Sequence, residues 1–259
     1  MSAVELTEAA RETYERLFGR APQPDARDPE LLTMLQNEIF GEVFSTGVLD
    51  DKLRELITVT ALASLGALPQ LRAHVGAALN AGSSPLEVRE AVYSCALYIG
   101  WPGALNAVSA VDEAFEARGI ALPLEDAATV TAEEREEAGA AIQTPLYGGE
   151  VREVFANLPG EFGRFVPHLL TADSFGYFYT RRGLDVRTRE LLSVVTLAAT
   201  GASAQLPAHI SGALRAGNSL LEVTAALVQA LPYIGIPKAF SALLLIAKWD
   251  ENGSHEAYR

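Results

Sequence analysis

The chain has 259 residues, of which 49% are hydrophobic, and a formal net charge of −13. This length and apolar content suffice for one large hydrophobic core or two moderate ones. The acidic balance disfavours a nucleic-acid partner, because a protein that binds phosphates needs clustered lysine and arginine to displace counterions.

The N-terminal stretch MSAVELTEAARETYERLF is typical of a charged amphipathic helix, and it lacks the pattern of a signal sequence. The longest apolar stretches, such as residues 240–247, are too short to cross a bilayer, so we expect a cytoplasmic protein without membrane contact. Cys95 is the single cysteine, which excludes an intrachain disulfide, a Cys-x-x-Cys pair and a thiolate metal cluster. Four scattered histidines without ligand spacing predict no metal site.

A long internal repeat is present. Residues 50–111 align without gaps to residues 185–246, with 28 identities in 62 positions. The two copies lie 135 residues apart, and each contains a histidine within a similar stretch, QLRAHVGAALNAG or QLPAHISGALRAG. The identical pairs include Arg54/Arg189, Glu55/Glu190, His74/His209, Tyr98/Tyr233 and Pro102/Pro237.

Each copy is predicted to be helical. Apolar residues recur at helical spacing from residue 53 to 65 and in segments that begin after residues 70, 85 and 102, and no alternating strand pattern competes. Gly82 and Gly217 are suited to left-handed helix caps, and residues 84–87 and 219–222 are Ser-x-x-Glu capping boxes. Pro102 and Pro237 fit the first turn of a further helix, where no amide hydrogen is needed. The predicted fold class is all-α.

Composition separates the two units. Residues 121–148 are rich in proline, glycine and acidic side chains, which predicts a solvated linker with one short helix from Thr131. The first unit is then residues 1–120 and the second is residues 149–259.

Three motifs carry a family resemblance. GEVF, RELITVTALASLGALPQLRAHVGAALNAG and YIGWPGALNA, in this order and with counterparts in the second half, resemble the carboxymuconolactone decarboxylase family. The resemblance implies two tandem helical bundles with the alkylhydroperoxidase D-like fold. The peroxidase branch of that superfamily has a Glu-x11-Cys-x2-Cys-x3-His pattern. Both copies keep its Glu-to-His spacing but replace the cysteines, at Ala67, Gln70, Ala202 and Gln205, so we exclude thiol peroxidase activity.

The decarboxylase-like branch implies proton transfer without a cofactor. Loss of carbon dioxide leaves an enolate-like anion that needs a proton at carbon and groups that stabilise its charge. The resemblance implies His74 as the acid and base, with Glu55 as an orienting carboxylate. Glu42 is a second acidic candidate, because FGEVF resembles an element that precedes the histidine-bearing helix in the decarboxylases. The remaining candidates are Glu190 and His209 for catalysis and Arg54, Arg72, Tyr98 and Trp101 for binding an anionic substrate.

The spacing alone does not predict contact between Glu55 and His74. In a plain helical hairpin that turns near Gly66, Glu55 lies about 17 Å before the turn and His74 about 6 to 8 Å after it. Their pairing is therefore implied by the resemblance only.

Two functions stay open. The first is a cofactor-independent lyase or isomerase that acts on a small carboxylated or lactone-like ring, with the first copy active because it keeps Glu42 and Arg72. The second is a non-catalytic ligand-binding or scaffold protein, because a histidine in an apolar helix is often a core residue. Single-copy members of the family form rings of six subunits, or trimers in the peroxidase branch. A two-copy chain is thus expected to form a homotrimer that rebuilds a pseudo-hexamer.

Overall fold

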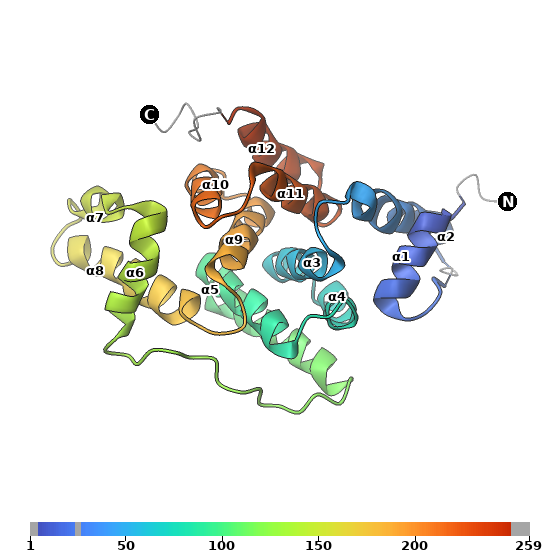
Figure 1. The fold of residues 1–259 in the computed structure, drawn as a ribbon, viewed down its shortest axis with the longest axis horizontal. Coiled ribbons are helices and arrows are strands. Elements are labelled where there is room, and N and C mark those ends of the chain that lie inside the picture. The colour runs from blue at the N-terminus through green and yellow to red at the C-terminus, as the bar shows by residue number, and fades with distance from the viewer. Residues whose placement is uncertain (1–4, 24–26, 250–259) are drawn as a thin grey trace.

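The computed structural model describes residues 5–23 and 27–249, whose regular structure is helical (Figure 1). The chain begins with α1 (Glu8–Phe18), α2 (Pro29–Gln36), the π-helical η1 (Asn37–Glu42), the 3-10 helix η2 (Val43–Thr46), α3 (Asp51–Leu65), α4 (Leu68–Asn80) and α5 (Pro85–Glu116). It continues with α6 (Arg135–Tyr147), α7 (Glu150–Phe155), α8 (Phe162–His168), the π-helical η3 (Leu169–Tyr179), α9 (Val186–Thr200), α10 (Leu206–Arg215), α11 (Leu220–Ile234) and α12 (Ile236–Ala247). The prediction of an all-α chain with two tandem helical copies is confirmed.

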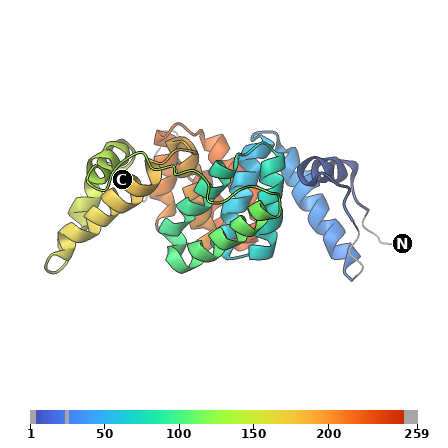
Figure 2. The same ribbon diagram turned by 90° about the horizontal axis from the view of Figure 1, so that it is seen from below.

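The two copies share one hydrophobic core. Helix α3 of the first copy packs against α9 and α11 of the second, and α5 packs against α9. Buried side chains from both copies belong to this core, among them Ile57, Val92, Val194 and Leu227. The centre of the molecule is therefore a single bundle, and flanking helices extend from it on opposite sides (Figure 2).

The predicted helix boundaries are present in both copies. Ser84 and Ser219 form capping boxes with the glutamates three residues later, and Gly82 and Gly217 have φ of 96° and 99°. The helical path breaks at Gly100, with φ 74° and ψ 166°, two residues before Pro102. The same break at Gly235 separates α11 from α12. Glycine tolerates the positive φ that these breaks require.

The flanking helices repeat one arrangement. Helix α1 packs against η1 and α4, and α6 packs against η3 and α10.

The helix expected from Thr131 is α6, which begins at Arg135. Helix α6 lies close to η3 because two glycines, Gly139 and Gly176, face each other there. A Cβ atom at Gly139 would lie 2.1 Å from the Thr171 carbonyl oxygen, and one at Gly176 would lie 2.3 Å from that of Arg135. The unit boundaries at 120 and 149 stay predictions.

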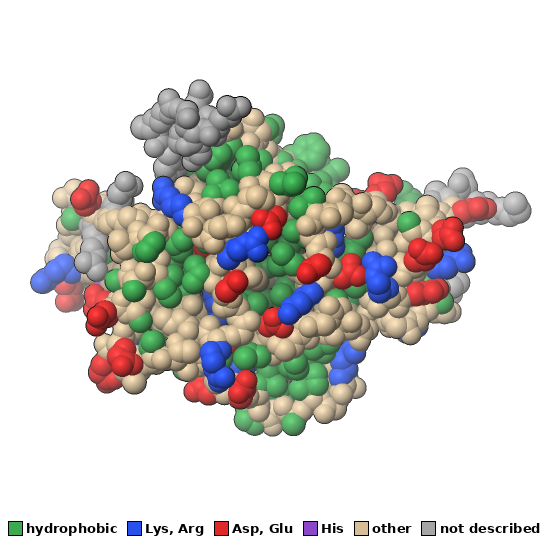
Figure 3. Space-filling model, in the orientation of Figure 1, with side chains coloured by type: hydrophobic (Ala, Val, Ile, Leu, Met, Phe, Trp, Pro, Cys, Tyr) green, Lys and Arg blue, Asp and Glu red, His purple; other side chains and the backbone are tan. Residues whose placement is uncertain are grey.

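The surface carries charges of both signs. On the face drawn in Figure 3, lysine and arginine are interspersed with aspartate and glutamate, and apolar side chains show over α12. Within residues 5–23 and 27–249, no helix is long and apolar enough to cross a membrane. A cytoplasmic location stays a prediction.

Two buried arginines join the copies. Arg54 donates hydrogen bonds to Gln229 Oε1 at 2.8 Å and to the carbonyl oxygens of Leu49 and Val43. Arg189, the counterpart of Arg54 in the second copy, has a charged partner in the first copy. Its Nη2 lies 3.1 Å from a carboxylate oxygen of Glu90. Both arginines are at most 1% exposed.

Arg189 also donates a hydrogen bond from Nη1 to Ser94 Oγ of the first copy at 3.0 Å. Glu90 additionally accepts from Arg181 at 3.0 Å. Removal of one partner from such a buried ion pair is strongly destabilising, because the charge that remains is buried without compensation.

We expect Glu90→Gln to lower the free energy of unfolding by about 3 to 5 kcal/mol, because it leaves the buried Arg189 without a countercharge. Chemical denaturation monitored by circular dichroism measures the change. Glu113→Gln is the matched control, since its ion pair with Arg72 is exposed and contributes about 1 kcal/mol or less. Equal effects of the two substitutions would contradict this account of the interface.

Candidate active site

The first-copy couple consists of Glu55 on α3 and His74 on α4. Nδ1 of His74 lies 2.8 Å from Oε2 of Glu55, and both residues are buried. The contact that spacing alone did not predict, and that the family resemblance implied, is present. The distances along the two helix axes differ by about 10 Å, and the reach of the two side chains spans this difference. The catalytic roles of both residues stay predictions.

Aromatic rings enclose His74. The ring centroids of Phe18 and Tyr233 each lie 5.5 Å from its own, and Phe40 stacks at 6.5 Å. Phe18 and Phe40 come from α1 and η1, whereas Tyr233 comes from α11 of the second copy. The site around the first histidine is thus built by both copies.

The contact with Glu55 determines which nitrogen of His74 carries a proton. An ionised carboxylate only accepts hydrogen bonds, so Nδ1 of His74 donates, and Nε2 is the atom available for proton transfer. The other carboxylate oxygen, Oε1 of Glu55, is buried and has no hydrogen-bond partner among the described residues. A carboxylate behind the imidazole holds the ring in one orientation and one tautomer, which is an arrangement that acid–base catalysis uses.

The second-copy couple, Glu190 on α9 and His209 on α10, has a different geometry. Nδ1 of His209 lies 3.7 Å from Oε2 of Glu190. The hydroxyl of Tyr147 from α6 lies between them: it hydrogen-bonds to Oε2 of Glu190 and lies 2.9 Å from Nδ1 of His209. Tyr98 of the first copy packs on His209 at 5.7 Å, which mirrors Tyr233 on His74.

The other predicted site residues lie elsewhere. Glu42 is exposed, and no hydrogen bond or ion pair joins it to His74 among the residues described. Arg72 pairs with Glu113 at 2.9 Å, and the buried Arg54 points toward the second copy. Trp101 is 66% exposed and faces Phe178. Tyr98, predicted as a substrate contact, lies beside His209.

Sequence reasoning missed Tyr147 and its counterpart Phe18. The signal is present, because Leu17-Phe18-Gly19 resembles Leu146-Tyr147-Gly148. This pair is offset by 129 residues, whereas the rest of the repeat is offset by 135, so a gapless alignment does not find it.

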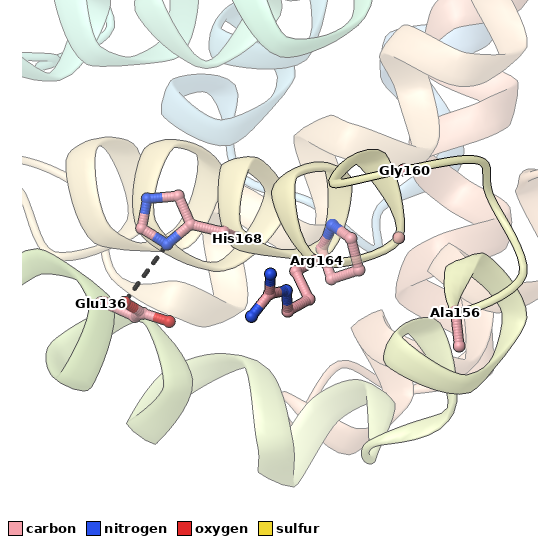
Figure 4. Close-up of a pocket in the computed structure, with 7 residues that line it drawn as sticks. Glu136, Ala156, Gly160, Arg164 and His168 are labelled. Atoms are coloured by element: carbon pink, nitrogen blue, oxygen red, sulfur yellow. Dashed lines mark ion pairs between the residues drawn. The ribbon is translucent and has the colours of Figure 1, made fainter.

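Two cavities lie away from both couples. One, of about 490 Å³, lies between α6 and α8, where Glu136 pairs with His168 at 3.2 Å and Arg164 lines the wall (Figure 4). The other, of about 410 Å³, is lined mainly by aromatic and aliphatic side chains around Trp101. Neither is lined by a histidine of the couples. Within the described residues, no cluster of three histidine, cysteine or acidic side chains could hold a metal ion.

Cys95 is a structural thiol. It is fully buried in the shared core, and burial raises its pKa to about 11. A thiol that stays protonated and has no second cysteine in the chain cannot support peroxide reduction by a thiol pair.

Family comparison agrees with the repeat. The sequence profile of the carboxymuconolactone decarboxylase family matches residues 29–113 and again residues 166–248. The 4-carboxymuconolactone decarboxylase of Acinetobacter baylyi is 37% identical over 82 residues, which are 32% of this chain and 61% of that protein. The nitrosuccinic acid decarboxylase of Metarhizium robertsii is 28% identical over 110 residues, which are 42% of this chain and 77% of that protein. The match therefore spans less than two thirds of the Acinetobacter relative.

One solved structure shows the same fold over nearly the whole chain. It is described as a candidate gamma-carboxymuconolactone decarboxylase subunit from Burkholderia xenovorans LB400. The TM-score is 0.55 at 24% identity, and the alignment covers 92% of this chain and 95% of that one.

Four tyrosines near the couples should resist ionisation. Burial, with nearby carboxylates or phenols, raises the pKa of Tyr98, Tyr147, Tyr179 and Tyr233 above the ordinary value. A raised pKa means that the folded state holds these protons more tightly, so their contribution to stability is complete below about pH 10 and is lost at higher pH.

Tyrosinate absorbance at about pH 11 should therefore report fewer than all eight tyrosines in the native protein and all eight in denaturant. The free energy of unfolding should fall between about pH 10 and 11. Full ionisation of a still folded protein would contradict the burial of these hydroxyls.

Proposed function

The chain belongs to the carboxymuconolactone decarboxylase family, and we propose that it is a cofactor-independent decarboxylase or isomerase that acts by proton transfer on a small carboxylated, lactone-like compound. The observation that carries this proposal is the buried first-copy couple, with His74 Nδ1 at 2.8 Å from Glu55 Oε2. An imidazole backed by a carboxylate and screened from water by three rings is suited to deliver a proton to carbon.

The proposed step balances without a further reactant. The carbon–carboxylate bond breaks, carbon dioxide leaves, and the electron pair stays on the carbon, delocalised into the adjacent electron-withdrawing group. His74, in its imidazolium form, gives the Nε2 proton to that carbon and becomes neutral, while Glu55 stabilises the charged imidazole before the transfer. Solvent then returns one proton to His74, so the net reaction converts the carboxylate and one solvent proton into the protonated product and carbon dioxide.

The named relatives support a substrate class. Carboxymuconolactone and nitrosuccinic acid both carry a carboxylate in conjugation with, or next to, a group that can hold the electron pair, a lactone in one and a nitro group in the other. We infer that this chain acts on a small acid of this activated kind.

A scaffold protein is the second candidate. It is favoured by the low exposure of His74, 7%, and by the ring packing around it. In this reading the couple would stabilise the fold without turnover. The two functions differ in what a histidine substitution changes, which is activity in the first and stability alone in the second.

We expect His74→Ala to reduce decarboxylation by about 10² to 10⁴-fold, the usual contribution of one acid–base group, while helical content is kept. Carbon dioxide release from 4-carboxymuconolactone and nitrosuccinate, followed by mass spectrometry, measures the rate. His168→Ala is the control, because His168 lies on α8 beside Glu136 and away from the couples. A folded His74→Ala protein with full activity would refute the assignment.

We also propose that three chains form a ring. Apolar side chains are exposed at equivalent positions of the two copies, Trp101 and Leu105 on α5 and Ile236 and Phe240 on α12, at 52% to 66% exposure. Exposed apolar faces of this kind mark contact surfaces. Two related faces on each chain suit a closed assembly of three chains with pseudo-sixfold symmetry.

Light scattering coupled to size exclusion should give three times the 27.7 kDa mass of one chain. Leu105→Glu combined with Phe240→Glu should lower the mass, because each change buries a charge in the proposed contact. A mass of one or two chains for the unsubstituted protein at micromolar concentration would exclude the trimer.

A further inference from the structure

The final residues of α1 and α6 occupy equivalent places in the two copies. Phe18 ends α1 and Tyr147 ends α6, each after a buried leucine and before a glycine with φ of 67°. The centroid of Phe18 lies 5.5 Å from that of His74, and the centroid of Tyr147 lies 5.3 Å from that of His209. The two rings are counterparts that differ in one hydroxyl group.

That hydroxyl changes how the couple is connected. In the first copy, His74 contacts Glu55 directly. In the second copy, the phenol oxygen of Tyr147 bonds to both Glu190 and His209, whose side chains are 3.7 Å apart. A phenol has one proton, so it donates to the carboxylate and accepts from Nδ1 of the histidine. A neutral oxygen therefore replaces the carboxylate as the direct partner of His209.

A glycine provides the room for this hydroxyl. A Cβ atom at Gly212 would lie 2.5 Å from the Tyr147 hydroxyl oxygen and 2.7 Å from both Cζ of Tyr147 and Oε2 of Glu190, too close for real contacts. The residue 135 positions earlier is Ala77, which is fully buried. Two positions on different helices thus differ together between the copies. The copy with the hydroxyl has no methyl group at position 212, where it would collide with the end of the Tyr147 side chain.

We propose that Tyr147 is a positioning residue that closes the second-copy couple, which means that it keeps Glu190 and His209 from contacting each other directly. Its hydroxyl donates to the carboxylate of Glu190 and accepts the Nδ1 hydrogen of His209. Each chain then carries one working site and one latent site. This inference rests on the proposed function of the first-copy couple. Tyr147 also has no proton left for a substrate, because its single hydrogen is bound to Glu190. The latent site becomes competent when the hydroxyl is removed and Glu190 contacts His209.

Two reciprocal exchanges test the proposal. Tyr147→Phe with Gly212→Ala converts the second copy to the residues of the first, and Phe18→Tyr with Ala77→Gly does the opposite. Because a methyl group at position 212 would also lie 2.7 Å from Cζ of residue 147 and from Oε2 of Glu190, Tyr147→Phe is also made alone, and circular dichroism checks that each variant folds. Tyr177→Phe is the control, since Tyr177 is exposed and stacks on Arg135 away from both couples.

The first readout needs no substrate. In protein labelled with ¹⁵N-histidine, the Nδ1 and Nδ1–H resonances report whether the partner is a carboxylate or a neutral oxygen. The exchange in the second copy should move the His209 resonances toward those of His74, and the opposite exchange should move the His74 resonances toward those of His209. Histidine resonances that do not move in either exchange would overturn the proposal.

The second readout is decarboxylation in a His74→Ala background, where only the second copy remains. Adding Tyr147→Phe, alone or with Gly212→Ala, should raise the residual rate by about tenfold or more, since a carboxylate-backed imidazole replaces a phenol-backed one. An unchanged rate, with the His209 resonances moved as expected, would show that Tyr147 does not hold the site closed.

The two proposals fail in different ways. If the unsubstituted protein releases no carbon dioxide from any acid tested, the proposed function fails, while the resonances still decide whether Tyr147 separates Glu190 from His209. If the unsubstituted protein is active and the exchanges have no effect, only the closure by Tyr147 is refuted.

Discussion

The structure depends on two buried guanidinium groups that reach from one copy into the other. Arg54 and Arg189 are almost fully buried, and a charge in an apolar interior is tolerated only when its hydrogen bonds are satisfied. Backbone carbonyls from each arginine's own copy accept part of them. Side chains of the other copy accept more, Gln229 from Arg54 and Glu90 with Ser94 from Arg189. Separating the copies would expose these charges and the shared core together.

This constraint also builds the site. Glu55 follows Arg54 directly, so α3 presents the arginine to the other copy and the glutamate to His74. Because the copies are held in this register, Tyr233 of the second copy lies against the histidine of the first. Neither copy encloses its histidine alone, which gives a physical reason for keeping two units in one chain.

The copies have diverged where charge and space allow. Glu90 supplies a countercharge to Arg189, whereas the counterpart of Glu90 is Ala225, and Arg54 relies on neutral acceptors. The second copy carries a hydroxyl at Tyr147, where Gly212 leaves room for it. Tyr233 packs on His74 and Tyr98 packs on His209, so both histidines keep a packing role whether or not both sites keep the same chemistry.

The sequence by itself determined the repeat, the helices and their ends, because caps and breaks depend on local residues such as Ser84, Gly100 and Pro102. It also placed Glu55 and His74 at a spacing that a known family shares. Only the tertiary structure decided that their side chains touch, that Glu42 and Arg72 do not join them, and that Tyr147 enters the second couple. The reason is that these contacts depend on how helices far apart in the chain pack against one another, and periodicity within one helix carries no information about the helix it will meet.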